Sequence, residues 1–332
     1  MDIEETTGSR IVISLSAVTG ISLVMMVLRF FCKAKYSKRF GWDDYLLAAS
    51  WVCLLIYFGL TAAAVTHGIG RHRALIPPAS LVMALRLLYA GRFFAIIASA
   101  ISKTSFIVTL MPMAKKRWQR NVLWSVMISL NLVLWICGFS LFFECSPIRK
   151  AWDISATGTC WGLQTQVNVE VAAGGYSAIM DFALTLLAVI LIRHLPMDLK
   201  GEKFGVLIAL SLGIFAGAAG VVKSYFLAGA IRSTDFTFSS ASLLIWSASE
   251  PAITIMAASL PSFRPIVQEL SQASRPAATT GDTQKRGWSF RTKGKKYETL
   301  DDDWITGTSS ADGGPRRGRL VMQDGKATVT YL

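Results

Sequence analysis

Four ionisable residues interrupt long apolar stretches of this sequence: Lys103, Asp181, Lys223 and Glu250. A charge inside the hydrocarbon of a membrane is costly unless it is paired or hydrated, so such residues are typical of ion pairs, ligand sites and switching elements. Depths counted at ~1.5 Å per helical residue predict that Lys103 pairs with Asp181 and that Lys223 pairs with Glu250. The pairs are either a ligand or switch site or a structural tie between helices, and the sequence leaves both open.

Pro251 directly follows Glu250. A proline inside a helix removes one backbone hydrogen bond, here the one that the carbonyl of Ser247 would accept, and favours a kink. We therefore expect a kink beside a buried carboxylate. That arrangement suits a ligand pocket or a moving helix as well as a structural contact.

The sequence contains no recognisable set of residues for catalysis or metal binding. It holds no GxSxG, no HExxH and no phosphate-binding glycine loop. The five cysteines show no CxxC spacing, and the three histidines (His67, His72 and His194) are scattered. We expect neither an enzyme nor a metal site.

The composition is that of an integral membrane protein. Hydrophobic residues make up 52% of the 332 positions and charged residues only 17%, whereas soluble domains have roughly a quarter charged residues. Apolar blocks of about twenty residues match ~30 Å of hydrocarbon, where the backbone must satisfy its own hydrogen bonds by forming helices. We predict an all-α bundle of seven transmembrane helices, at Ile11–Cys32, Tyr45–Thr66, Leu88–Met111, Val122–Phe143, Val167–Ile192, Phe204–Ala228 and Ala241–Leu260.

The distribution of basic residues predicts the orientation of this bundle. With the N-terminus outside, the inner loops carry eleven Lys and Arg residues and the outer segments carry seven, in agreement with the preference for positive inner loops. The acidic first residues also disfavour an inner N-terminus. We expect a short extracellular N-terminus at residues 1–10, a membrane domain at 11–264 and a cytoplasmic tail at 265–332, in the plasma membrane.

The tail after Arg264 is basic and poor in aliphatic residues, so we expect it to be disordered. Its segment Lys285–Lys296 interleaves Trp288 and Phe290 with basic residues, and it either lies on anionic lipid or stays solvated. We therefore expect the net charge of +13 to favour contact with the anionic surface of the lipid bilayer. We expect no nucleic-acid partner.

Other charged residues lie near the expected helix ends. Arg29 and Arg92 are close enough to the interfaces for their guanidinium groups to reach the headgroup region, so we interpret them as anchors. Asp43 and Asp44 open the second helix, where the helix dipole favours acidic residues. Their expected partners are Lys38–Arg39.

Cys145 and Cys160 fall in the expected outer loop between the fourth and fifth helices, on the oxidising side of the membrane. A bridge between them would close a loop of about fifteen residues and stabilise the fold by about 3 kcal/mol in the chain-entropy account. We predict this disulfide. Cys53 and Cys137 lie within helices and are interpreted as apolar fillers.

An ordered series of short motifs along residues 10–270 resembles a known family. The residues that carry the resemblance are Arg29, Gly41-Trp42-Asp43-Asp44-Tyr45, His67-Gly68-Ile69-Gly70-Arg71-His72, Lys103-Thr104-Ser105, Cys145-Ser146-Pro147, Trp152, Cys160, Asp181, Lys200, Gly213, Trp246, Glu250 and Leu260-Pro261-Ser262-Phe263-Arg264. In this order they are similar to the fungal rhodopsin-domain family, the integral membrane proteins grouped with plant-pathogen surface receptors and with the satratoxin-cluster membrane protein.

The resemblance implies a seven-helix, receptor-like fold, in a family whose members mostly have no known ligand or activity. The expected seventh helix contains no lysine, so we do not expect retinal bound through a Schiff base, and Lys223 is better explained by Glu250. Helix 3 ends in Met111-Pro112-Met113-Ala114 instead of an Asp/Glu-Arg-Tyr motif, and no Asn-Pro-x-x-Tyr follows in helix 7. Coupling to a G protein therefore follows from the resemblance alone.

Three functions fit these observations. We expect receptor-like sensing of an unidentified extracellular small molecule, with a cytoplasmic signalling partner that binds the inner loops and tail. The first alternative is a transporter or export component, which the buried charges suit but the lack of an internal repeat does not. The second is a membrane accessory protein of a secondary-metabolite biosynthetic pathway.

Overall fold

A computed structural model describes residues 7–37, 40–153, 155–193, 200–232, 236–263, 318–323 and 326–331 of the chain. The chain divides into two units, Met1–Pro276 and Ala277–Leu332. The first holds the helices, and the described part of the second is a hairpin. Residues 38–39, which we predicted to pair with the carboxylates of Asp43 and Asp44, lie outside the described residues. Residues 264–317, which include most of the tail that we predicted to be disordered, also lie outside them.

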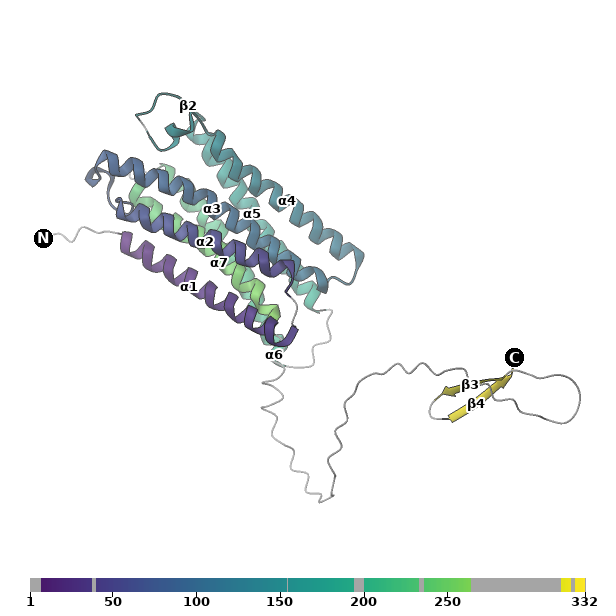
Figure 1. Ribbon diagram of the computed structural model, residues 1–332. Helices are drawn as coiled ribbons and strands as arrows, with labels where there is room; N and C mark the ends of the chain where they lie inside the picture. The colour runs from purple at the N-terminus through teal and green to yellow at the C-terminus, as the bar shows by residue number, and fades with distance from the viewer. Residues whose placement is uncertain are drawn as a thin grey trace, which may run out of the picture. The chain divides into compact units, whose positions relative to one another are not determined.

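Seven long helices run side by side in the first unit (Figure 1). Each is long and apolar enough to cross a bilayer, which confirms the predicted multi-pass membrane fold. Their bounds are α1 Gly8–Cys32, α2 Trp42–Thr66, α3 Pro78–Leu110, α4 Arg117–Phe143, α5 Leu163–Arg193, α6 Lys200–Arg232 and α7 Phe236–Ser259. Shorter helical segments are η1 Lys33–Ser37, η2 Arg73–Leu75, η3 Met111–Met113, η4 Ile148–Ala151 and η5 Leu260–Phe263.

Every helix begins before its predicted first residue, and α3 differs most. It begins at Pro78 instead of Leu88. Proline is favourable in the first turn, because its missing N–H would have no partner there and its backbone is already helical. The added turns include Arg86 and were missed because the prediction followed apolar residues only.

Helix α3 contacts α2, α4, α5 and α7, so it is central to the bundle. Polar side chains reinforce these contacts. The hydroxyl of Ser50 on α2 donates to the carbonyl of Ala98 at 2.9 Å, and the amide of Asn131 on α4 donates to the Thr104 hydroxyl at 2.7 Å. Residues on α3 can therefore meet charged groups from several neighbouring helices.

Glycines bring α5 and α6 close together. A Cβ atom added at Gly213 would lie 2.1 Å from the Thr185 hydroxyl oxygen, and one added at Gly220 would lie 3.0 Å from the Ala178 Cβ. Small residues permit such close approach of membrane helices, where packing rather than hydrophobic burial drives association.

The outer surface of the helices is apolar, as lipid contact requires. Val24, Ile128 and Leu186 expose 65%, 61% and 63% of their surface along the helix sides. Trp42 exposes 82% and Tyr45 66% at the start of α2. Exposed aromatic residues at a helix end are typical of the membrane–water interface.

The two ends of the bundle differ. At one end, here called the disulfide end, α1 begins and β1 (Cys145–Ser146) pairs with β2 (Thr159–Cys160) (Figure 1). The opposite end, called the tail end, carries η1, η3 and η5. At the disulfide end the Gly70 N–H donates to the Thr237 carbonyl at 3.1 Å. Gly68 and Gly70 have φ of +111° and +91°, which only glycine adopts readily.

The end of the tail forms an antiparallel hairpin of β3 (Gly318–Gln323) and β4 (Lys326–Tyr331). This differs from the disorder that we expected throughout residues 265–332. β-branched residues such as Val321 and its partner Thr328 favour extended backbone. For residues 264–317 disorder stays a prediction.

Candidate functional site

Lys103 lies on α3 with its side chain fully buried. Its Nζ atom is 2.7 Å from Oδ2 of Asp181 on α5 and 2.8 Å from Oε1 of Glu250 on α7. It also donates to the hydroxyl of Ser177 at 2.5 Å. One ammonium group therefore joins three helices and faces two carboxylates.

Glu250 accepts hydrogen bonds from four residues. Its Oε1 atom accepts from Ser99 on α3 at 2.8 Å and from Ser177 on α5 at 3.0 Å, besides its contact with Lys103. Its Oε2 atom is 2.5 Å from Nζ of Lys223 on α6. The side chain of Glu250 exposes only 1% of its surface. Hydrogen bonds to both carboxylate oxygens offset the free-energy cost of burying the charge.

The structure brings all four predicted residues together in one network, Asp181–Lys103–Glu250–Lys223. Both predicted contacts are present, and a third contact between Lys103 and Glu250, which the sequence did not predict, joins them. The additional contact was missed because depths were counted along ideal helices with predicted ends, and every helix begins earlier than predicted. A role as ligand or switch site stays a prediction.

The network alternates in charge and is neutral as a whole. Lys103 stands between two carboxylates and Glu250 between two ammonium groups, so the two inner members each have two opposite charges. The end members have one each. In a low-dielectric interior the loss of an inner residue leaves one end residue without an opposite charge, whereas after the loss of an end residue its neighbour keeps one charged partner. The arrangement can change its pairing at either end while its centre remains intact.

Pro251 lies inside α7, which runs without interruption from Phe236 to Ser259. The carbonyl of Glu250 accepts a hydrogen bond from the Thr254 hydroxyl at 2.9 Å, so local side chains supplement backbone bonding near the proline. The predicted kink stays a prediction.

A second network at the tail end corrects the interpretation of Arg29 as an anchor. Its side chain is fully buried, with Nε 2.9 Å from Oδ1 of Asp44 and the terminal nitrogens bonded to Asp43 and to the carbonyl of Ala258. Lys33 lies 2.7 Å from both carboxylates. Carboxylates at the start of α2 and the carbonyl at the end of α7 converge on Arg29, so it does not need to reach the headgroups.

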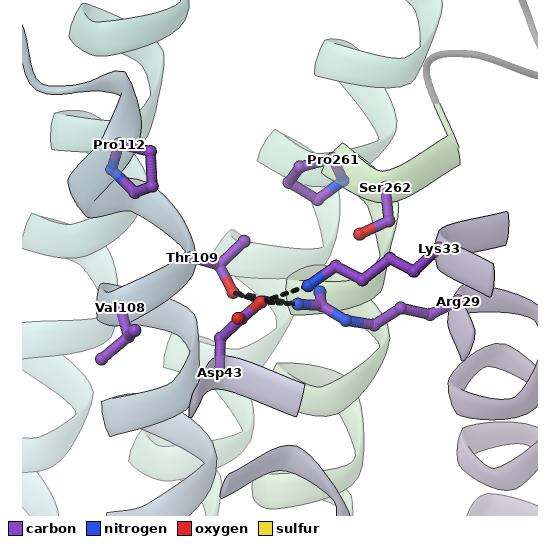
Figure 2. A pocket seen from close by; sticks show the side chains of 8 residues that line it. All are labelled: Arg29, Lys33, Asp43, Val108, Thr109, Pro112, Pro261 and Ser262. Carbon is purple, nitrogen blue, oxygen red and sulfur yellow. Dashed lines mark hydrogen bonds and ion pairs between the residues drawn. The ribbon is translucent and has the colours of Figure 1, made fainter. Parts of the chain in front are cut away.

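A cavity of about 210 Å³ adjoins this network (Figure 2). Figure 2 shows Arg29 of α1 and Lys33 of η1 directed toward Asp43, with Thr109 of α3 opposite them. The cavity is large enough for a few waters or one small solute. It is lined by Arg29, Lys33, Asp43, Val108, Thr109, Pro112, Pro261 and Ser262.

A third charged cluster near the disulfide end corrects the interpretation of Arg92. Its terminal nitrogen lies 2.9 Å from Glu144, at the end of α4, and 2.8 Å from Glu170 on α5. Arg92 also lies over the ring of Tyr89, 5.5 Å from its centroid. Burial raises the pKa of Glu144, and Arg92 opposes that shift. Arg92 is thus an interhelical contact rather than a free anchor.

The loop after Glu144 contains the predicted disulfide between Cys145 and Cys160, which the structure confirms. The N–H of Trp161 donates to the carbonyl of Glu144 at 2.8 Å, which extends the short β1–β2 pair. Hydrogen bonds from Ser155 lower the pKa of Asp153 in the same loop. The bridge holds the end of α4, with Glu144, close to the start of α5.

Sequence reasoning missed the two serines that complete the central network. Ser99 precedes Lys103 by four residues, and Ser177 precedes Asp181 by four. Residues four apart lie on one face of a helix, so this repeated spacing was the signal that could have found them. Glu144 and Glu170 gave no such signal, because each lies on a different helix from Arg92.

Comparisons with known proteins agree with this architecture. The chain is 24% identical to the polyenoic acids biosynthesis gene cluster protein Ba17b of Metarhizium anisopliae, over 80% of this chain and 76% of that protein. It is 25% identical to the wortmanamides biosynthesis cluster protein C of Talaromyces wortmannii, over 80% and 73%. It is 27% identical to a SAT4 family membrane protein of Emericella nidulans, over 56% and 46%. No solved structure matches.

The family match itself covers the greater part of the seven-helix unit. The fungal rhodopsin domain matches residues 28–269, which include the three charged clusters and the disulfide. The chain therefore belongs to the fungal rhodopsin domain family.

Proposed function

We propose that this chain is a receptor-like membrane protein that responds to a small molecule by moving α6 and α7 relative to α3 and α5. The observation that carries the proposal is the central charge network, which joins all four helices. Lys103 and Asp181 tie α3 to α5, and Lys223 ties α6 to Glu250 of α7. A ligand that favours one pairing over another would shift the packing of these helices.

Several features support a switching role over a fixed tie. The Lys223–Glu250 contact is the only ion pair that involves α6 among the described residues, and Pro251 follows in α7. Helix motion needs a bistable element that small energetic differences can bias. A charge network with alternative pairings meets this requirement, because the Lys223–Glu250 contact can open while Lys103 still holds both carboxylates.

The proposal places the N-terminus and the disulfide end outside the cell, the basic tail in the cytoplasm and the protein in the plasma membrane. It includes no enzymatic activity and no retinal. The support is the basic bias of the expected inner loops and the absence of lysine from α7. A cytoplasmic signalling partner would bind the inner loops and the tail.

The test measures whether breaking the network moves α6. Spin labels on cysteines placed at Ile208 of α6 and Val122 of α4, which are exposed at 36% and 39%, report the distance between these helices. Glu250→Gln weakens the Lys223 contact and should shift or broaden this distance. A control pair at Val27 of α1 and Val122 should change less. An unchanged α4–α6 distance in a folded Glu250→Gln protein would contradict the proposal.

The spin-label experiment uses a chain in which the free cysteines are replaced by alanine and the disulfide is retained. The free cysteines of the described chain are Cys32, Cys53 and Cys137. The background chain must keep the elution volume and melting temperature of the original protein. Any change in the distance between the spin labels can then be attributed to the change in the charge network.

The relatives favour a second function, as an export component or accessory protein of a secondary-metabolite pathway. Two proteins that are 24% and 25% identical over 80% of this chain are named for biosynthetic clusters. Deletion of the gene in its source fungus separates the functions. Loss of an exporter should retain a metabolite inside the cells with biosynthetic transcripts unchanged. Loss of a receptor should change transcripts, and loss of an accessory protein should lower total product.

A further inference from the structure

Lys223 is the most accessible member of the central network. Its side chain exposes 22% of its surface, whereas those of Lys103, Asp181 and Glu250 expose 0%, 5% and 1%. It is also an end member, with Glu250 as its one ion-pair partner within the described part of the chain. An incoming group would therefore reach Lys223 before the other three.

Lys223 does not lie on the side of α6 that its most exposed neighbours in sequence mark as lipid-facing. Val221 and Tyr225 expose 52% and 75% of their surface and mark that side. At 3.6 residues per turn, Lys223 lies roughly opposite both of them. Its ammonium group is thus directed into the bundle, toward α7, where it meets Glu250.

Glu250 can release Lys223 and still be hydrogen-bonded. Without that contact its Oε1 atom keeps Lys103 at 2.8 Å, Ser99 at 2.8 Å and Ser177 at 3.0 Å. The release leaves Lys223 as a partly buried cation that needs a new anion. A carboxylate from another molecule would reproduce the contact that Lys223 loses when it separates from Glu250.

We propose that Lys223 binds the carboxylate of a lipophilic carboxylic acid that enters the bundle from the bilayer. This inference rests on the proposed ligand-responsive function and names its ligand class. The acid arrives in its neutral form, since a free carboxylate is costly in hydrocarbon. Its O–H bond breaks, a new O–H bond forms at Oε2 of Glu250, and the ligand carboxylate takes the place of Glu250 beside Lys223.

This exchange keeps the charge of the site unchanged. Before it, Lys223 is paired with Glu250; afterwards, it is paired with the ligand, and Glu250 is a neutral acid. Lys103 keeps Asp181 as a charged partner at 2.7 Å. The tie between α6 and α7 is replaced by a tie between α6 and the ligand, which is how binding would free α7.

The test measures binding of a fluorescent polyene fatty acid, cis-parinaric acid, and of its methyl ester to the purified full chain in lipid nanodiscs. The acid should bind saturably and about tenfold or more tightly than the ester, because only the acid supplies a carboxylate. Added as the anion in a weakly buffered solution, it should take up about one proton per bound molecule, since Glu250 becomes protonated.

Variants assign the binding to Lys223. Glu250→Gln resembles the protonated carboxyl, so it should bind the acid at least as tightly as the unmodified chain. Lys223→Gln combined with Glu250→Gln removes both charges together, which protects the fold, and should bind the acid no better than the ester. Lys33→Gln, the same substitution at the tail end, should leave binding unchanged.

Equal affinity of the unmodified chain for acid and ester would overturn the inference, as would acid binding that survives in the folded double variant. Equal loss of binding in Lys33→Gln would show that the acid responds to charge in general, and would also overturn it. The spin-label test of α6 motion does not depend on the outcome of these binding measurements. If α6 moves in Glu250→Gln but the acid does not bind, the ligand class is wrong and the switch is retained.

Discussion

The Nε atom of Arg29 lies 2.9 Å from Oδ1 of Asp44, and the two side chains expose 0% and 3% of their surface. The same guanidinium donates to the carbonyl of Ala258 at the end of α7 and to the hydroxyl of Thr109 on α3. One side chain of α1 therefore connects α2, α3 and α7. This contact closes the tail end of the bundle, beside the cavity in Figure 2.

Replacement of Arg29 by lysine should lower stability even though the charge is kept. A lysine has three donors on one nitrogen and cannot reproduce the planar fork that reaches two carboxylates and a carbonyl. Acceptors left without partners cost about 1–3 kcal/mol. The melting temperature in detergent should fall clearly for Arg29→Lys and little for Lys33→Arg, whose side chain is 18% exposed. Equal melting temperatures would show that the fork contributes nothing.

Gly213→Ala should destabilise the contact between α5 and α6. The new Cβ would lie 2.1 Å from the hydroxyl oxygen of Thr185 and 3.0 Å from its Cβ, so Thr185 must move and give up its bond to the Asp181 carbonyl. Overpacking of this kind costs about 1–3 kcal/mol. Gly175→Ala on α5 is the matched control, since its Cβ would meet nothing within 4 Å. A Gly213→Ala protein as stable as this control would contradict the close packing.

The sequence was sufficient to predict the seven helices because each apolar block is long enough to cross the bilayer and has no alternative as a strand. It was also sufficient to single out Lys103, Asp181, Lys223 and Glu250, since charges in apolar blocks stand out without any knowledge of packing. The disulfide followed from two cysteines in one loop.

The contacts between helices could not be predicted with the same success. Arg29 was interpreted by its distance from a helix end, but its environment is set by Asp44 of α2 and Ala258 of α7, which are remote in sequence. The Lys103–Glu250 contact depends on where α3 and α7 begin and how far each is shifted along its axis. Neither quantity can be read from hydropathy.

Removal of the disulfide should destabilise the disulfide end of the bundle. Cys145 and Cys160 close a loop of fifteen residues, so each single Cys→Ser change should lower stability by about 3 kcal/mol in the chain-entropy account. Each should also expose one new thiol to a membrane-impermeant label, detected by mass spectrometry. Cys53→Ser is the control and should expose none. Labelling of both cysteines in the unmodified, non-reduced protein would contradict the bridge.

Two double variants with the same net charge should differ in stability. Asp181→Asn with Lys223→Gln removes both ends of the central network and leaves Lys103 and Glu250 charged, 2.8 Å apart. Lys103→Gln with Glu250→Gln removes the centre. It leaves Asp181 and Lys223 charged, and the described structure shows no ion pair between these two. The first variant should be more stable, because its remaining charges compensate each other.

The difference should be about 1 kcal/mol if unpaired groups in the membrane find water or other partners, and about 3–5 kcal/mol if they stay buried and alone. Melting curves followed by size-exclusion chromatography of the heated protein measure it. Lys103→Gln with Asp181→Asn is the reference, since it leaves the Lys223–Glu250 pair intact at 2.5 Å. If the centre-deleted and end-deleted variants melt together, both below this reference, the Lys103–Glu250 contact does not stabilise the bundle. The four residues would then act as two independent pairs.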